Sequence, residues 1–200
     1  GGYGRDFIDQ RDNIGARGIR GKSTHYDDAV GVPMIMSGPD IPAGQLCRTP
    51  VSLIDLAPTI LHGVGADPYD WAEGLPGRSL FEIAAAPYDA ARTVFSEYHA
   101  FASPSGAFML RDGRYKLNHY VGYPAELFDM EKDPGETRNL ADDPGHAAIL
   151  ARLGGQLRVL VDPEAVDASA KAAQAALIER WGGPAAAANI GAPGATPAPV

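Results

Sequence analysis

The chain has 200 residues, of which 45% are hydrophobic, a formal net charge of −8 and one cysteine. This length and composition suit one domain, or one and a half, with a buried core, which excludes a globally disordered chain. The negative charge argues against a nucleic-acid-binding protein. The lack of any run of eighteen apolar residues argues against a membrane span. The single cysteine excludes an internal disulfide framework and a cysteine-rich zinc site.

Glycine and charged residues dominate the start of the chain, and residues 1–24 are predicted to form a loop around one short helical turn. The chain begins with neither an initiator methionine nor the apolar core of a signal peptide, so we expect a fragment of a longer protein. The apolar run Val32–Met36, which ends at turn-forming residues, predicts a strand buried on both faces, as in a parallel sheet. Pro33 then lies at the start of that strand, where no ladder donor is needed.

A polar loop over 39–50 leads into a predicted helix that Thr49 or Ser52 can cap. Its apolar face carries Leu53, Leu56, Ile60 and Leu61. Pro58 falls inside this pattern, which predicts a kink or two short helical pieces. The helix is expected to end at the glycines around residue 64, and residues 66–91 are predicted to form a loop with one short helix near 79–85.

Four short strands are predicted after residue 91, because aromatic and β-branched residues alternate there with turn signals. These strands cover 93–99, 106–110, 115–120 and 125–129, and the pair Asp112-Gly113 favours a tight hairpin. A helix that opens near residue 142 carries an apolar stripe of 3.6-residue period, which should cover the small antiparallel sheet. A second helix, 163–181, starts at Pro163 with Asp162 as its cap.

Candidate metal ligands lie near the start of the chain. Asp9, Asp12 and Asn13 stand in a loop, where carboxylate and amide oxygens suit a hard cation. The alternative reading is that these side chains cap turns.

Lys22 is the candidate anion-binding residue. It follows Gly21 and precedes Ser23 and Thr24, a setting that suits a phosphate- or sulfate-like oxyanion. The spacing of the glycines and the lack of a preceding strand exclude a nucleotide-binding P-loop. Alone, Lys22 would be an exposed surface lysine.

Three further side chains can act as acid, base or ligand: His25, Glu97 and His99. Strand alternation puts Glu97 and His99 on one face, which predicts either the edge of a site or a solvated face. Cys47 has no neighbouring base or second cysteine and is predicted to be structural.

Several of these segments, taken in order, resemble the C-terminal part of the sulfatase family, within the alkaline-phosphatase-like superfamily. The matching segments are Ile8–Gly15, Gly18–Lys22, Tyr26–Asp27, Gly31–Ile35, Thr49–Thr59, Leu75–Leu80, Leu127–Glu136 and Asn139–Leu140. The likeness is to bacterial choline-sulfatase-like and arylsulfatase-type enzymes and covers about residues 9–160.

This resemblance implies hydrolysis of sulfate monoesters, by a formylglycine made from the cysteine of a C-x-P-x-R motif beside a divalent metal, usually calcium. By position, Asp9 matches the metal carboxylate, Gln10 stands at the neighbouring metal ligand, and Lys22 matches the lysine that contacts the sulfate. Glu97 and His99 are the candidate substrate contacts.

The sequence departs from the family pattern at three points. Gln10 replaces a histidine or asparagine, Arg11 replaces a glycine beside the metal, and C-x-P-x-R is absent because Cys47 is followed by Arg-Thr-Pro. The formylglycine is therefore expected upstream, and we predict that the chain alone is inert. Two alternatives stay open: a fragment of a phosphodiesterase or phosphonate monoester hydrolase of the same superfamily, and a non-catalytic remnant or interaction module.

The resemblance implies an α/β fold class in three parts. Residues 1–91 are the remainder of an alkaline-phosphatase-like α/β domain, 92–182 form a small antiparallel sheet packed by a helix, and 183–200 are a disordered tail of alanine, proline and glycine. The expected partner is a small-molecule sulfate ester, with neither nucleic acid nor membrane involved. We expect a soluble protein of the bacterial cytoplasm or periplasm.

Overall fold

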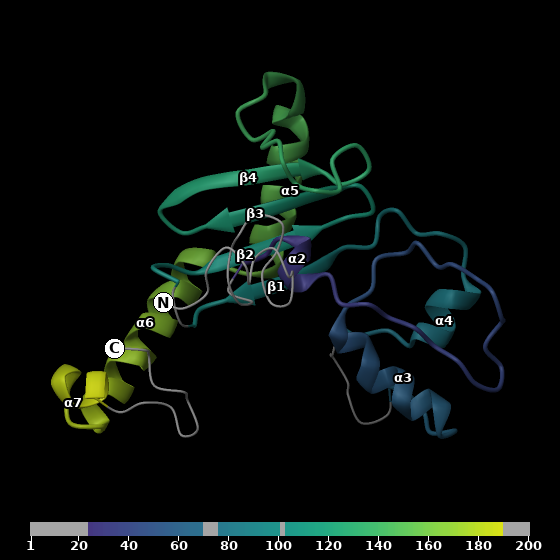
Figure 1. Ribbon diagram of the computed structural model, residues 1–200, viewed down its shortest axis with the longest axis horizontal. Coiled ribbons are helices and arrows are strands. Elements are labelled where there is room, and N and C mark those ends of the chain that lie inside the picture. Colours follow the sequence, from purple (N-terminus) through teal and green to yellow (C-terminus); the bar gives the residue numbers. More distant parts are fainter. Residues whose placement is uncertain (1–23, 70–75, 101–102, 190–200) are drawn as a thin grey trace, which may run out of the picture.

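A four-stranded antiparallel sheet is the centre of the molecule in this computed structural model, which describes residues 24–69, 76–100 and 103–189 (Figure 1). The strands are β1 (Val94–Tyr98), β2 (Ala107–Arg111), β3 (Tyr115–Tyr120) and β4 (Tyr123–Asp129), and they lie side by side in chain order. The small antiparallel sheet predicted from the sequence is thus confirmed.

The hairpin between β2 and β3 sets the register of the sheet. Arg111 pairs with Lys116, and the carboxylate Oδ1 of Asp112 accepts hydrogen bonds from the backbone nitrogens of Arg114, at 2.9 Å, and Tyr115, at 2.6 Å. A side chain that satisfies turn amides in this way fixes where the chain reverses. The Asp-Gly pair therefore predicted the turn correctly.

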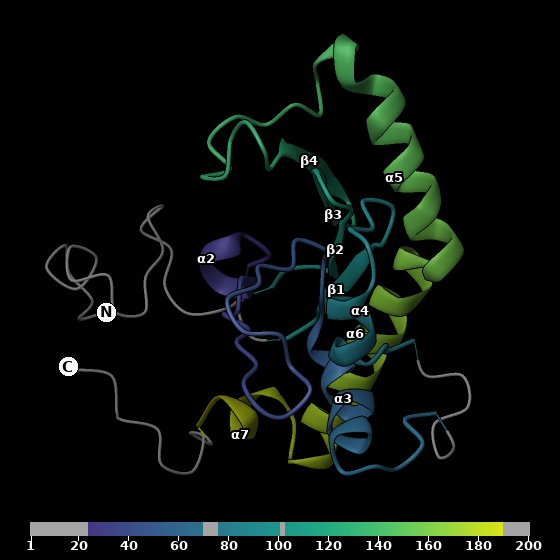
Figure 2. The same ribbon diagram turned by 90° about the vertical axis from the view of Figure 1, so that its right-hand side faces the viewer.

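Helix α5 (Ala147–Leu160) covers one face of the sheet (Figure 2). Its buried Leu153 and Leu157 pack against apolar side chains of all three later strands. The core between them consists of Phe108, Leu110, Leu117, Leu127, Leu140, Leu153 and Leu157. The predicted helical stripe is confirmed, because one helix face carries the apolar residues that the sheet must bury.

The short 3₁₀ turn η2 (Pro144–His146) precedes α5. Helix α6 (Pro163–Arg180) follows α5 directly. Asp162 caps α6, with its Oδ1 accepting from the nitrogen of Ala165 at 3.1 Å, as the sequence predicted. Helix α7 (Pro184–Asn189) lies inside the stretch for which the sequence predicted no regular structure. Its four alanines have the highest helix propensity and Pro184 suits the first helical position, which explains this difference.

The helical segment near residue 56 consists of two pieces, η1 (Leu53–Asp55) and α3 (Leu56–Gly63), and α4 (Leu80–Ala85) packs beside them. Two pieces were predicted, but the break precedes Leu56 instead of falling at Pro58. Pro58 lies in the first turn of α3, where a backbone donor has no helical partner anyway.

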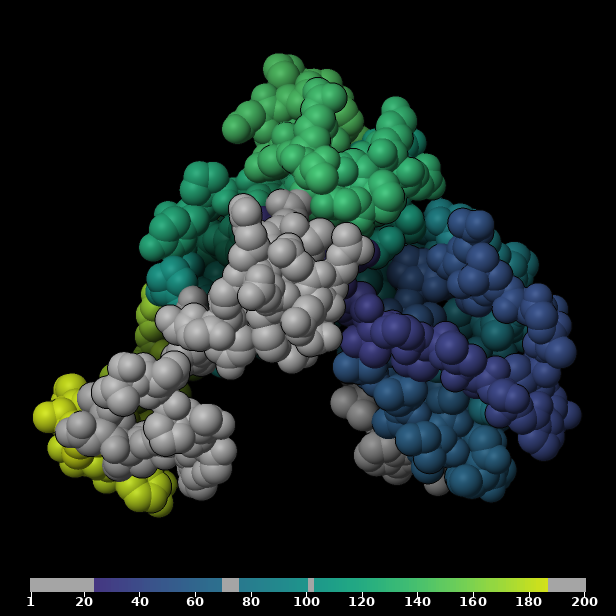
Figure 3. Space-filling view, in the orientation of Figure 1, coloured from purple at the N-terminus to yellow at the C-terminus, as the bar shows by residue number. Residues whose placement is uncertain are grey.

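The predicted strand Val32–Met36 is not formed. This segment is extended and largely exposed, with 90% of Ile35 accessible. The sheet has no parallel strand beside it, so the described residues offer no ladder to this apolar run. Figure 3 shows the purple and blue segments gathered to one side of the green sheet-and-helix region. No helix of the described ranges is long and apolar enough to cross a membrane.

Candidate functional site

The face of the sheet opposite α5 carries charged and polar side chains, and the short helix α2 (Asp27–Val30) lies against it (Figure 2). We call this group of interacting residues the α2 anchor. Its members are Tyr26, Asp27, Arg111, Lys116, Tyr120, Glu126 and Glu136.

Asp27 is the centre of the α2 anchor. Its Oδ1 lies 2.7 Å from Nζ of Lys116, and its Oδ2 lies 3.0 Å from Nη1 of Arg111. The backbone nitrogen of Asp27 donates to Oε2 of Glu136 at 2.6 Å. Both the side chain and the backbone of the first α2 residue are therefore attached to the sheet and to the loop after it.

Lys116 is fully buried, although it carries a charge. Its Nζ lies between two carboxylates, 2.7 Å from Asp27 and 2.8 Å from Oε1 of Glu136. Burying an ammonium group is costly unless it is paired, and two nearby carboxylates compensate for its lost hydration. The position of Lys116 thus depends on Asp27 and Glu136, and theirs on Lys116.

Glu126 forms the second half of the anchor. Its Oε1 accepts from the hydroxyl of Tyr26 at 2.6 Å, and its Oε2 accepts from the hydroxyl of Tyr120 at 2.9 Å. Burial and the Glu126 carboxylate raise the pKa of Tyr120 well above its usual range, so this hydroxyl stays a donor. The ring of Tyr26 packs edge-on against Phe128, with centroids 6.0 Å apart.

His25 lies directly before the anchor and is 2% exposed. Burial, followed by the nearby charges of Lys116 and His99, lowers the pKa of His25 to about 4. The imidazole is therefore neutral at pH 7. Its Nδ1 is buried without a hydrogen-bond partner among the described residues.

Glu136 reaches the anchor from the loop after β4. Its backbone has a φ of 53°, the left-handed region that few residues other than glycine adopt. Hydrogen bonds from Glu136 N to the carbonyl of Asp133, and from Thr137 Oγ1 to Oδ1 of Asp133 at 2.9 Å, stabilise the loop. Sequence reasoning found Glu136 as part of a motif but missed its partner Lys116, for which a charged residue inside a strand was the available signal.

Five of the predicted site residues lie outside the described residues: Asp9, Gln10, Asp12, Asn13 and Lys22. Within the described ranges, no group of three or more histidine, cysteine, aspartate or glutamate side chains is placed to hold a metal ion. The metal-ligand and sulfate-contact assignments therefore stay predictions.

Glu97 and His99 do lie together, with Oε2 and Nε2 3.8 Å apart. Glu97 is opposite Phe108 in the sheet register, so both belong to the face that α5 covers. His99 packs edge-on against Phe108, and its carbonyl accepts from Nε2 of Gln174 on α6. The two predicted side chains are thus neighbours on the face opposite α2, and their role as substrate contacts stays a prediction.

The described residues also line two cavities. One of about 510 Å³ adjoins the anchor, with Asp27, Arg48 and Arg111 among its charged lining residues. The other, of about 540 Å³, lies between α4 and the segment 34–51, and its lining is mostly apolar. The thiol of Cys47 borders this second cavity, 4.0 Å from the carbonyl of Ile83.

A family model described as the C-terminal part of N-sulphoglucosamine sulphohydrolase matches residues 15–162. The chain belongs to the sulfatase family. The match includes the whole α2 anchor and ends at Asp162, the cap of α6.

Curated sulfatases align with most of the chain. It is 32% identical over 179 residues to a choline-sulfatase of Rhizobium meliloti, covering 86% of this chain and 33% of that protein. It is 38% identical over 139 residues to a Δ4,5-hexuronate-2-O-sulfatase of Bacteroides thetaiotaomicron, covering 63% of this chain and 27% of that one. The chain thus spans between about a quarter and a third of the length of these relatives.

Among solved structures, a phosphonate monoester hydrolase from Silicibacter pomeroyi is similar to this sulfatase-family chain. The TM-score is 0.57 at 35% sequence identity, over 69% of this chain and 30% of the other. The alkaline-phosphatase-like α/β fold class predicted from the sequence is confirmed.

Proposed function

We propose that the chain is the C-terminal part of a hydrolase that cleaves sulfate monoesters. One observation carries this proposal: the family match runs from residue 15, before Lys22, through the α2 anchor and the loop of Glu136 in unbroken order. The relatives with which it aligns over most of its length are named as sulfatases. In the complete enzyme the chain would supply one wall of the site, and residues 1–91 would complete the α/β domain.

Lys22 has the proposed role of binding the sulfate group. Its ammonium would stabilise negative charge on the transferring group, which is the main contribution a fixed cation makes to such a reaction. Asp9 and Gln10 are proposed ligands of a divalent metal, for which calcium suits their oxygen donors. When bound, the metal would act as a Lewis acid on the sulfate.

The nucleophile is proposed to come from sequence outside this chain, as a formylglycine. Cys47 does not qualify, since the arginine and proline around it do not match C-x-P-x-R. We therefore expect a small-molecule sulfate ester to be hydrolysed only when the missing part of the site is present.

A second candidate is hydrolysis of phosphonate monoesters, which the likeness to the Silicibacter pomeroyi enzyme favours. Sulfate and phosphonate monoesters both present an anionic tetrahedral centre, so Lys22 and a metal suit either. The names of the curated relatives favour the sulfate ester.

The test compares the chain alone with the chain joined to the sequence encoded directly upstream, using 4-nitrophenyl sulfate and a 4-nitrophenyl phosphonate monoester. We expect turnover of the sulfate ester by the joined protein and none by the chain alone. Lys22→Met should lower kcat of the joined protein by roughly 100-fold, the usual cost of losing one oxyanion contact.

Two results would contradict this proposal. Turnover by the 200-residue chain alone would show that its own residues contain a nucleophile. A joined protein that prefers the phosphonate ester would favour the second candidate instead.

A further inference from the structure

The cavity of about 510 Å³ beside the α2 anchor has walls from three separate parts of the chain. They are α2 with the residues after it, the segment 48–53, and neighbouring parts of β1 and β2. Val94 pairs with Arg111 in the sheet register, and Ser96 pairs with Met109. Because Arg111 binds Asp27 of α2, these four side chains share the α2 face of the sheet, and this corner of the sheet forms one wall.

Two arginines line the cavity from different walls, Arg48 from the segment 48–53 and Arg111 from β2. Arg48 is exposed, and it has neither a hydrogen bond nor an ion pair within the described part of the chain. Arg111 donates through Nη1 to Oδ2 of Asp27 at 3.0 Å, and its guanidinium group forms no other hydrogen bond with a described residue. Both side chains therefore have N–H donors left for a ligand.

The lining of the cavity is positively charged. It includes two arginines and a single acidic residue, Asp27, which gives a formal charge of +1. The carboxylate of Asp27 is already bound to two cations, Arg111 at 3.0 Å and Lys116 at 2.7 Å. The whole chain, in contrast, has a formal net charge of −8. A positively charged cavity in a negatively charged protein favours an anion as its ligand.

Most of the other lining side chains are apolar, and they include Val51, Leu53, Phe95 and Met109. The hydroxyl of Ser96 also lines the cavity and has no hydrogen-bond partner among the described residues. Sites for small molecules typically combine an apolar lining with a few polar groups that fix the orientation of the ligand. The lining thus suits a molecule with an apolar part and a charged end.

We propose that this cavity binds an amphiphilic organic anion, whose carboxylate or sulfate group contacts Arg48 and whose apolar part packs against the apolar lining. Guanidinium groups bind both kinds of anion through paired N–H donors. Transfer of the apolar part from water into the cavity adds to the affinity. Such binding needs neither a nucleophile nor a metal, so it is independent of the proposed hydrolysis.

Ligand-observed saturation-transfer NMR on the 200-residue chain tests this site with three six-carbon probes: hexanoate, hexyl sulfate and 1-hexanol. We expect saturable binding of at least one of the two anions, and the anion with the lower Kd identifies the charged group that the cavity prefers. The uncharged 1-hexanol should bind at least about tenfold more weakly than that anion. Equal affinity for 1-hexanol, or no saturable binding of either anion, would overturn the proposal.

The substitution Arg48→Gln tests the charged contact. Because Arg48 is exposed and unpaired within the described residues, its loss should leave the fold intact. The Kd of the preferred anion should rise at least about tenfold, while that of 1-hexanol stays unchanged. An anion affinity equal to that of the wild type would contradict the assignment of Arg48.

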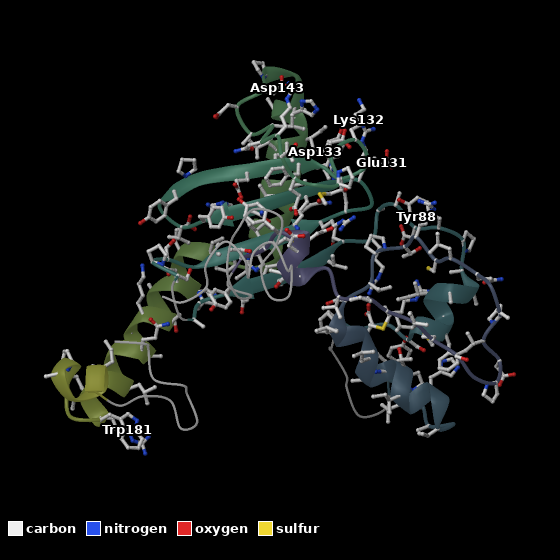
Figure 4. The ribbon with its side chains drawn as sticks, in the orientation of Figure 1. Tyr88, Glu131, Lys132, Asp133, Asp143 and Trp181 are labelled. Carbon is white, nitrogen blue, oxygen red and sulfur yellow. The ribbon has the colours of Figure 1, made fainter. Side chains whose placement is uncertain are left out.

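Lys132→Gln is the matched control, since it also removes one positive charge from an exposed position. Lys132 lies on the loop after β4 (Figure 4), and β4 and β1 form opposite edges of the sheet. We expect wild-type affinity for the anion in this variant. An equal loss of affinity in Arg48→Gln and Lys132→Gln would indicate a general effect of net charge and would also overturn the proposal.

A pair of cavity-filling variants locates the bound anion. Ser96→Phe places a ring in the proposed cavity, whereas Ala85→Phe places one in the apolar cavity beside α4. Phenylalanine suits a strand position and Ala85 is exposed, so both variants should fold. We expect Ser96→Phe to abolish saturable binding of the anion and Ala85→Phe to preserve it. The opposite pattern would place the anion in the other cavity and refute the proposed site, whether or not the joined protein hydrolyses sulfate esters.

Discussion

His25 shows how burial determines the protonation state of a single side chain. It is nearly inaccessible to solvent, and the ammonium of Lys116 lies in its surroundings, so protonation is disfavoured twice. The sequence indicated only that His25 could be an acid, a base or a ligand. Its low pKa in the folded chain keeps the imidazole neutral at pH 7, next to the α2 anchor, and its role as acid, base or ligand stays a prediction.

The folded chain should lose stability as the pH falls from 6.5 towards 4. The pKa of His25 is about 4 when folded and about 6.5 when unfolded, so between these values the unfolded chain binds the extra proton. The stabilisation is complete above pH 6.5 and is lost below it, by about 3 kcal/mol over the whole interval. Urea denaturation at pH 7 and pH 4.5 measures it.

The control separates His25 from other groups. His119, whose pKa burial also lowers, changes stability in the same direction, so the comparison must be made between variants. His25→Phe should flatten the pH dependence, whereas His62→Phe, at an exposed position, should keep it. An unchanged pH profile in His25→Phe would contradict the explanation.

At the scale of elements, Asp55 joins three segments that are distant in the sequence. Its carboxylate accepts from the backbone nitrogens of Ser52, at 2.7 Å, and Arg78, at 2.9 Å, and from Nη2 of Arg92 at 2.7 Å. The carboxylate is fully buried. One side chain thus connects the start of η1, the approach to α4 and the approach to β1.

Asp55→Ala should therefore lower the free energy of unfolding by about 3 kcal/mol, because it leaves two backbone amides without their acceptor and the largely buried guanidinium of Arg92 without its carboxylate partner. Asp67→Ala is the control, since Asp67 accepts from the nitrogen of Tyr69 in an exposed turn. A loss below about 1 kcal/mol in Asp55→Ala would show that water replaces the carboxylate.

Local patterns predicted the β2–β3 hairpin, α5 and the cap of α6, because each depends on neighbours in the sequence. The α2 anchor was not predictable in this way. Lys116 pairs with Asp27 and Glu136, which are 89 and 20 positions away, and no local pattern encodes such distant partners. The strand predicted over Val32–Met36 was wrong because a local pattern was not enough. Its apolar pattern predicts a buried strand, but strand formation needs neighbouring strands that the described sheet does not offer.

At the scale of the whole molecule, the described chain leaves large apolar side chains accessible between residues 32 and 64. Ile35 is 90% exposed, Leu46 78%, Val64 73% and Ile60 64%. Apolar surface of this extent usually marks a contact region. It is consistent with a chain that spans between about a quarter and a third of the length of its relatives.

This exposure predicts that the chain alone self-associates at micromolar concentrations. The double variant Ile35→Lys with Leu46→Lys should be more monomeric, because charges replace the accessible apolar groups. Its free energy of unfolding should change by less than about 0.5 kcal/mol, since neither side chain is buried. Sedimentation velocity measures the association, with Val159→Lys on α5 as the control. A wild-type chain that is monomeric at micromolar concentrations would refute the predicted self-association.

The left-handed backbone of Glu136 has a consequence for mutational tolerance at that position. A residue with a Cβ adopts this conformation at a cost of roughly 1 kcal/mol, which glycine would avoid. Glycine, however, would remove the carboxylate that binds Lys116 and the Asp27 amide. The backbone conformation at this position thus favours glycine, whereas the ion pair with Lys116 requires a carboxylate. Because glutamate occupies the position, the contacts of its carboxylate outweigh the cost of the left-handed backbone.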